Sequence, residues 1–95
     1  MIVCAAINIK YVNSNDQVEQ LTVCGRRHGD CRKIIDKLDV CHMEHFKEGF
    51  IDHKNMFYDR KSAFLEAKVS GQLSQTTLWY KEDHNDDELY SEDLY

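Results

Sequence analysis

The order of apolar and polar residues along the chain predicts strands and helices in one small domain. Residues 2–9 are almost entirely apolar and rich in β-branched side chains, which is typical of a strand in the middle of a sheet. A turn-forming cluster follows at 13–16, and residues 17–24 alternate imperfectly between polar and apolar side chains. Together these segments predict an N-terminal β-hairpin.

A helix is predicted after this hairpin. Apolar side chains recur at helical spacing from Cys31 to Cys41 and form one stripe. Asp30 precedes the stripe at the expected N-cap, where its carboxylate can accept from free backbone N–H groups. We expect this helix to fade between Val40 and Met43.

The middle of the chain predicts a second hairpin and a second helix. Residues 49–58 contain two short extended segments with a turn-forming group at 52–55 between them. Asp59 is a good N-cap for a helix over 60–70, and Gly71 is a natural stop just after it. The small side chains of this helix would let it approach a sheet closely.

The C-terminal part carries weaker signals. Residues 78–80 are apolar and predict a short strand, and the acidic residues 82–88 predict a solvated loop. The last segment, 89–95, contains two Leu-Tyr pairs, so we expect it to dock on the domain or on a partner subunit. The chain is thus predicted to be a single α+β domain over 1–95.

Charge is unevenly distributed along the chain. The net charge is −5, yet residues 81–95 alone hold seven acids and one lysine. Residues 24–37 instead carry five basic and two acidic side chains, a local excess of +3. No run of about 18 apolar residues is present, which argues against a membrane span, and the N-terminus lacks the pattern of an export signal. We therefore expect a cytoplasmic protein.

The four cysteines allow a disulfide framework, a metal site or buried thiols. A reducing cytoplasm disfavours stable disulfides. Six residues separate Cys24 from Cys31, which does not match the two-to-four-residue spacing of a zinc knuckle. Because cysteine is also a small hydrophobic residue, buried thiols are the favoured interpretation, with no metal and no cofactor.

The best candidate ligand site is a basic loop between two glycines. Arg26, Arg27 and His28 lie between Gly25 and Gly29, just before the predicted helix. Glycine allows close backbone approach, the start of a helix favours an anion, and arginine matches phosphate oxygens. The alternative is a solvated basic loop that pairs with the acidic end of the same chain.

A second candidate group lies around the second hairpin. Phe50 and Phe57 could stack on a base, and Arg60 could reach a phosphate. The alternative is that these aromatic side chains fill the core and Arg60 pairs with a nearby carboxylate. If the binding interpretation holds, the arginines before the first helix and at the start of the second converge on one anion-holding cleft.

Evidence for catalysis is weaker. The chain has no P-loop, dinucleotide fingerprint or zinc-protease motif. His28 lies near Cys31, and Cys41 is followed by His42, but neighbouring residues of this kind seldom form a thiol nucleophile with its base. We therefore expect a binding protein rather than an enzyme.

Several short blocks in a fixed order resemble a group of short phage-encoded proteins, the anti-Thoeris signal-sequestering proteins or "sponges". They are C-A-A-I (4–7), C-G-R-R-H-G-D-C (24–31), G-F (49–50), F-Y-D-R-K-S-A (57–63), G-Q-L (71–73) and S-E-D-L-Y (91–95). The resemblance spans almost the whole chain. The acidic loop at 82–88 departs from the family's pattern.

The resemblance implies a phage counter-defence protein that is a symmetric homo-oligomer in the host cytoplasm. It would bind a cyclic ADP-ribose isomer or a cyclic oligonucleotide between subunits without cleaving it. The motifs carry this role to Arg26, His28, Phe50 and Arg60. The alternative, based on the acidic C-terminal residues, is an inhibitor that binds a host enzyme through protein–protein contacts, and neither hypothesis involves nucleic acid or a membrane.

Overall fold

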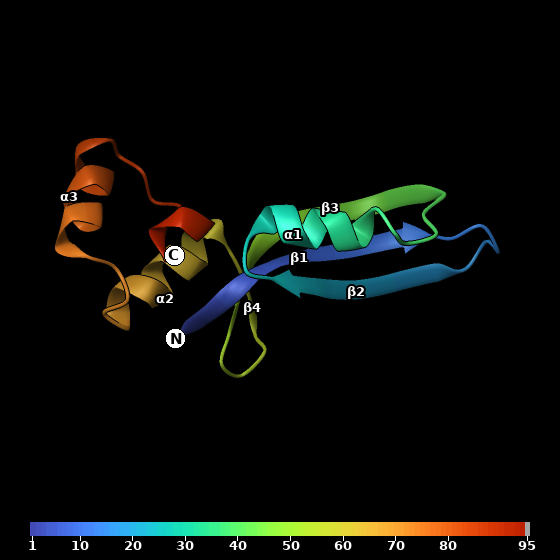
Figure 1. Ribbon diagram of the computed structural model, residues 1–95, viewed down its shortest axis with the longest axis horizontal. Helices are drawn as coiled ribbons and strands as arrows, with labels where there is room; N and C mark the ends of the chain where they lie inside the picture. Colours follow the sequence, from blue (N-terminus) through green and yellow to red (C-terminus); the bar gives the residue numbers. More distant parts are fainter. Residues whose placement is uncertain (95) are drawn as a thin grey trace.

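A computed structural model describes residues 1–94 and shows an α+β fold (Figure 1). A four-stranded antiparallel sheet has the strand order β2-β1-β3-β4. In chain order the elements are β1 (Ile2–Val12), β2 (Val18–Gly25), α1 (His28–Ile35), β3 (His42–Asp52), β4 (Phe57–Asp59), α2 (Arg60–Val69), α3 (Gln75–Asp83) and a 3-10 turn, η1 (Ser91–Asp93).

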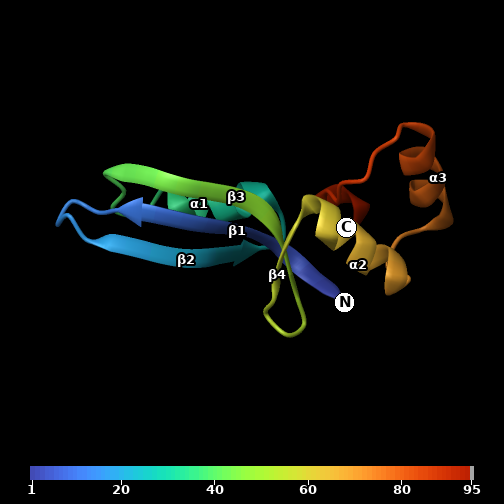
Figure 2. The same cartoon turned by 180° about the vertical axis from the view of Figure 1, so that it is seen from behind.

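The molecule is elongated, with principal extents of 49 × 27 × 18 Å. The helix α1 lies along one face of the sheet, and the opposite face is open when the molecule is viewed from behind (Figures 1 and 2). The helices α2 and α3 and the C-terminal segment lie beyond one end of the long strands (Figure 1). No helix of the described chain is long and apolar enough to span a membrane.

The predicted N-terminal hairpin is confirmed, and β1 is the central strand of the sheet. Its alternate residues Ala5, Ile7 and Ile9 are fully buried. They share one face of the sheet, because alternate side chains of a strand point to the same side. On that face they belong to the same core cluster as Cys31 and Ile35 of α1. Strand β1 thus contributes most of the apolar face on which the rest of the fold packs.

The first helix differs from its prediction at both ends. It begins at His28, with Arg27 as N-cap, and Asp30 lies inside the first turn, where its Oδ2 accepts from the Arg27 backbone N–H at 3.3 Å. The helix ends at Ile35, and the chain then follows a non-helical path, with Leu38 only partly buried against the core. The apolar residues beyond Ile35 therefore lie in a loop, although their spacing in the sequence is that of a helix.

The strand β3 is longer than predicted, because residues 42–48 are also paired with β1. A register shift opposite Lys10 and Tyr11 interrupts the alternation of side chains there. From Gly49 onward the second hairpin is confirmed, with Phe50 opposite Tyr58. The missed half of this strand carries Glu48, which proves central to the candidate site.

The second helix is confirmed with its predicted ends. The Asp59 side chain accepts from the Ser62 N–H at 2.8 Å, and Gly71 has a φ of +72°, which suits a glycine just after a helix. The predicted strand over 78–80 is wrong, because these residues lie in α3, whose N-cap Ser74 accepts from the Thr77 N–H at 3.1 Å.

The C-terminal segment docks on the domain, as predicted for the described part up to residue 94; Tyr95 lies outside the described residues. Leu89 is fully buried, and its N–H donates to the Arg60 carbonyl at 2.9 Å. The acidic stretch 82–88 is a solvated loop only in part. Its first two residues end α3, and Asp86 turns toward the buried Lys81.

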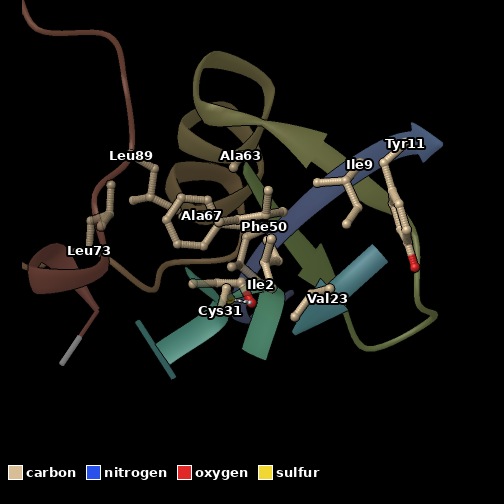
Figure 3. Close-up of a cluster of buried hydrophobic side chains, with 13 residues drawn as sticks. Ile2, Ile9, Tyr11, Val23, Cys31, Phe50, Ala63, Ala67, Leu73 and Leu89 are labelled. Carbon is tan, nitrogen blue, oxygen red and sulfur yellow. Dashed lines mark hydrogen bonds between the residues drawn. The ribbon is translucent and has the colours of Figure 1, made fainter. Parts of the chain in front are cut away.

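The core continues from the sheet into this junction (Figure 3). Phe50 is fully buried and lies close to Ala67 and Leu89, so a β3 side chain joins the sheet to α2 and to the C-terminal segment (Figure 3). The small Ala63 and Ala67 are also fully buried, which allows α2 to lie close to the sheet.

Candidate functional site

The site is built around His28, the first residue of α1, which is only 6% exposed. Its Nε2–H donates to the Gly49 carbonyl at 2.7 Å. This leaves Nδ1 as an acceptor, 3.2 Å from the Ser91 hydroxyl and 3.5 Å from Arg60 Nη2. Burial lowers the pKa of His28 below its usual value, and the nearby Arg60 charge acts in the same direction. The imidazole is therefore neutral at pH 7.

Arg60 begins α2 and connects His28 to the C-terminal segment. Its Nη1 donates to the Leu89 carbonyl at 2.8 Å, and its Nη2 lies 3.6 Å from Glu48 Oε2. The guanidinium also lies 5.0 Å from the centroid of the Tyr90 ring, within the range of a cation–π contact. Arg60 thus has a structural role, yet part of its guanidinium faces a cavity.

That cavity has a volume of about 230 Å³ and opens at the start of α1. Its lining consists of Arg27, His28, Gly29, Arg32, Glu48, Arg60, Tyr90, Ser91 and Glu92. With His28 neutral, three arginines face two glutamates, which leaves an excess of one positive charge. Glu48 forms ion pairs with both Arg32 and Arg60.

A second cavity of about 280 Å³ shares Glu48 and Arg60 with the first. Phe46, whose side chain is exposed on β3, lines this second cavity, and Tyr90 lines the first. The two cavities therefore share the Glu48–Arg60 pair, with the Phe46 ring in one lining and the Tyr90 ring in the other.

The structure brings together three of the predicted site residues, Arg27, His28 and Arg60. Arg26 is exposed and is not among the residues that line either cavity. Of the two arginines before the first helix, Arg27 thus lines a cavity with Arg60 and Arg26 does not; that this cavity holds an anion stays a prediction.

The two predicted aromatic site residues lie elsewhere. Phe50 is fully buried, and its ring meets His28 edge-on, with centroids 5.0 Å apart and an interplanar angle of 83°. It therefore supports His28 from the core and presents no ring face to a ligand. Phe57 is half-buried and packs closely against Gly49. A Cβ added to Gly49 would lie only 2.6 Å from the Phe57 Cζ.

Sequence reasoning missed Arg32, Glu48, Tyr90 and Ser91. Arg32 had a usable signal, because it lies four residues after His28 and so shares its helix face. Glu48 lies in the missed half of β3. Tyr90 and Ser91 reach the site only because the chain returns from α3, and no local pattern indicates that path.

The cysteines and metal ligands add no second centre in the described chain. Residues 1–94 hold no group of three or more metal-ligating side chains. The Cys31 thiol is buried, points to the Ala5 carbonyl at 3.7 Å, and has a pKa raised by burial to about 11. It is therefore protonated at neutral pH and behaves as a core side chain. The buried-thiol interpretation is wrong for Cys24 and Cys41, which are exposed.

Comparison with known proteins places the chain among phage-encoded proteins. A family model described as "Phage T4 y16D protein" matches residues 1–95. No curated protein and no solved structure matches the chain. Since the match covers the whole sequence, the chain belongs to the phage T4 y16D protein family.

Proposed function

We propose that this phage protein binds a nucleotide-type immune signal of the host, a cyclic ADP-ribose isomer or a cyclic oligonucleotide, and holds it without cleaving it. The observation that carries the proposal is the cavity lined by Arg27, Arg32 and Arg60. Guanidinium groups give strong charge-assisted hydrogen bonds to phosphate oxygens. Such sequestration in the host cytoplasm would be a counter-defence activity.

Glu48 determines how an anion would enter. It pairs with Arg32 and Arg60 in the described structure, so a phosphate would take over one or both of these contacts. Arg32 has the more exposed side chain of the two, at 53% against 20% for Arg60. We therefore expect Arg32 and Arg27 to make the first contacts, while Arg60 keeps its bond to the Leu89 carbonyl.

Tyr90 and Phe46 are suited to contact the bases. They line the two cavities that share the Glu48–Arg60 pair, and base–aromatic stacking adds about 1–3 kcal/mol per base. They would replace Phe50 in the stacking role that the sequence motif suggested. A cyclic dinucleotide, with two bases and phosphates between them, matches this order of aromatic and cationic groups, whereas a cyclic ADP-ribose isomer has one base and would use one of the two rings.

Capture rather than turnover is supported by the groups that face the cavity. Both ring nitrogens of His28 are engaged, Nε2 with Gly49 and Nδ1 with Ser91.

The cavity of about 230 Å³ is also smaller than most small-molecule sites, which are roughly 300–1,000 Å³. A second subunit would complete the enclosure, so the proposal includes a homo-oligomer.

Isothermal titration with cyclic ADP-ribose isomers and cyclic dinucleotides tests this function. Arg32→Ala and Arg27→Ala should each lose about 1.5–3 kcal/mol of binding free energy, a roughly 10- to 150-fold rise in Kd. Arg26→Ala is the matched control, because it removes the same charge beside Arg27 but outside the cavity lining. Mass spectrometry should recover the ligand unchanged after the protein is denatured.

Two results would contradict the proposal. The first is the absence of any binding by both ligand classes at millimolar concentration. The second is an Arg26→Ala variant that loses as much affinity as Arg27→Ala, because binding would then follow net charge rather than the cavity.

A further inference from the structure

A larger groove lies between α2 and α3, away from the arginine cavity. Its volume is about 660 Å³. The lining consists of Phe64, Lys68, Gln75, Leu78, Trp79, Lys81, Glu82, Asn85, Asp86 and Asp87. Figure 1 shows α3 at the end of the molecule farthest from the sheet, so this groove is formed by the two helices and the loop after α3.

Apolar side chains are unusually exposed around this groove. Trp79 is 64% exposed and Tyr80 is 61% exposed, although both belong to a helix. Leu65 and Val69 on α2 are also exposed, while Phe64 and Leu78 are half-buried in the groove. Of these exposed side chains, Trp79 lines the groove itself, together with Phe64 and Leu78. Exposed apolar side chains at a groove mark interaction sites, and tryptophan contributes strongly to binding energy at interfaces.

The charges of the groove are mainly acidic where they face solvent. Lys81 is buried at 3% exposed and is neutralised internally, by Asp93 at 2.9 Å and Asp86 at 3.4 Å. Of the remaining charged lining residues, Glu82 and Asp87 are exposed acids and Lys68 is an exposed base. Asp83 adds a further exposed acid at the end of α3.

We propose that this groove binds an amphipathic helix of another protein, one that presents apolar side chains flanked by lysine or arginine. Two helices with a groove between them accept a third helix, whose apolar face enters the groove. The lengths of α2 and α3, ten and nine residues, match a partner helix of about three turns. Trp79 would supply the main apolar contact, and Glu82 would pair with the basic flanks. Asp87 would exchange its exposed contact with Lys61, at 3.9 Å, for one with the partner.

Helix binding at this groove would not depend on nucleotide binding, and it would give the acidic C-terminal part of the chain a partner. The groove is the surface that an inhibitor of a host enzyme would use. A nucleotide could occupy the arginine cavity at the same time, because the residues that line the groove and that cavity do not overlap.

Trp79 makes the test direct, because it is the only tryptophan in the chain. The probe is a helical peptide of about 18 residues built from Leu, Ala and Lys, with its Lys residues replaced by Glu in a matched peptide. The Lys peptide should shift the Trp79 emission to shorter wavelength with saturation, and the Glu peptide should produce no saturable shift at the same concentrations.

Charge-reversal variants locate the site. The double change Glu82→Lys and Asp87→Lys should weaken binding of the Lys peptide at least 10-fold. Glu19→Lys with Glu44→Lys changes the net charge equally on exposed strand positions and should alter the Kd less than threefold. Circular dichroism establishes that both variants are folded, and nucleotide titration of the first variant separates this proposal from the arginine cavity.

Three outcomes would overturn the inference. The first is no saturable shift with the Lys peptide, and the second is an equal loss of affinity in both charge-reversal variants. The third is a self-associated protein by analytical ultracentrifugation whose Trp79 emission is already that of a buried indole, because a second copy would then occupy the groove.

Discussion

The two ends of this molecule are stabilised by different physical interactions. In the sheet, Ala5, Ile7 and Ile9 are fully buried and packed beneath α1. The helical end is formed by α2, α3 and the C-terminal segment. There, and at the start of α1 where this end meets the sheet, the buried groups include Lys81 and His28, whose polar atoms are all paired with other parts of the chain. The sheet is stabilised mainly by buried apolar area, whereas the helical end adds these directional polar contacts to its buried apolar side chains, among them Ala63, Ala67 and Leu89.

This difference explains why both proposed binding surfaces lie at or near the helical end. Hydrophobic burial is non-directional and fixes no charged or aromatic group at a defined position on the surface. Hydrogen bonds and ion pairs are directional, so they hold such groups at defined positions. Arg60 and Lys81 each bond to the C-terminal segment, and each also borders a cavity. The same interactions therefore stabilise this end and shape its surfaces.

The largest expected effect is at Phe50, the side chain that joins the two ends. Phe50→Ala should lower the free energy of unfolding by about 3–5 kcal/mol, because it leaves a cavity in the core. Phe46→Ala on the same strand is the control, and it should cost less than about 1 kcal/mol because that side chain is 44% exposed. Urea unfolding followed by circular dichroism measures both. Equal losses would mean that the two ends do not meet at Phe50.

Most elements with local sequence signals were predicted correctly, whereas elements that depend on contacts distant in the sequence were not. The hairpins and α2 follow from local signals, such as the alternation of β2, the Asp59 cap and the glycine after Ser70. The first half of β3 was missed because the register shift near Tyr11 interrupts its alternation. The strand predicted over 78–80 overlooked the Ser74 cap, which starts a helix whose apolar side chains stay exposed.

The candidate site shows the same limit. Arg27 and His28 were predicted because they lie at the start of a helix, where local sequence indicates an anion site. Arg60 was predicted because it closely follows the aromatic Phe57 and could reach a phosphate. Glu48, Tyr90 and Ser91 depend on long-range topology, since they come from a strand partner and from the returning C-terminal segment. Burial of Phe50 was an open alternative, and only the tertiary packing decides between a core ring and an exposed one.

Lys81 offers an intermediate effect that is confined to the helical end. Lys81→Met should destabilise the docked C-terminal segment by about 1–3 kcal/mol. This is less than the loss expected when a fully buried ion pair is broken, because the Asp86 side chain is 25% exposed and water can solvate it. Lys61→Met removes an exposed pair with Asp87 and should change stability by less than about 0.5 kcal/mol. Hydrogen exchange measures amide protection in residues 89–94. Equal loss of protection across β1 would show that the two ends unfold as one unit.

The smallest expected effect is the pH dependence contributed by His28. Because burial lowers the pKa of His28 in the folded state, the unfolded chain binds more protons as the pH falls below about 6.5. His28 should therefore contribute full stability above that pH and lose it on acidification, by about 1.4 kcal/mol for each unit of pKa lowering.

Comparison with His28→Gln isolates this contribution, because the other four histidines are exposed and are present in both proteins. Glutamine retains an N–H that can donate to the Gly49 carbonyl, yet it does not titrate. Urea unfolding at pH 7.5 and 5.5 should show a larger loss of stability on acidification for the native protein than for the variant. If the native protein instead gains stability relative to the variant at pH 5.5, the folded imidazole carries a proton, and Nδ1 cannot accept from Ser91 and Arg60 as the structure shows.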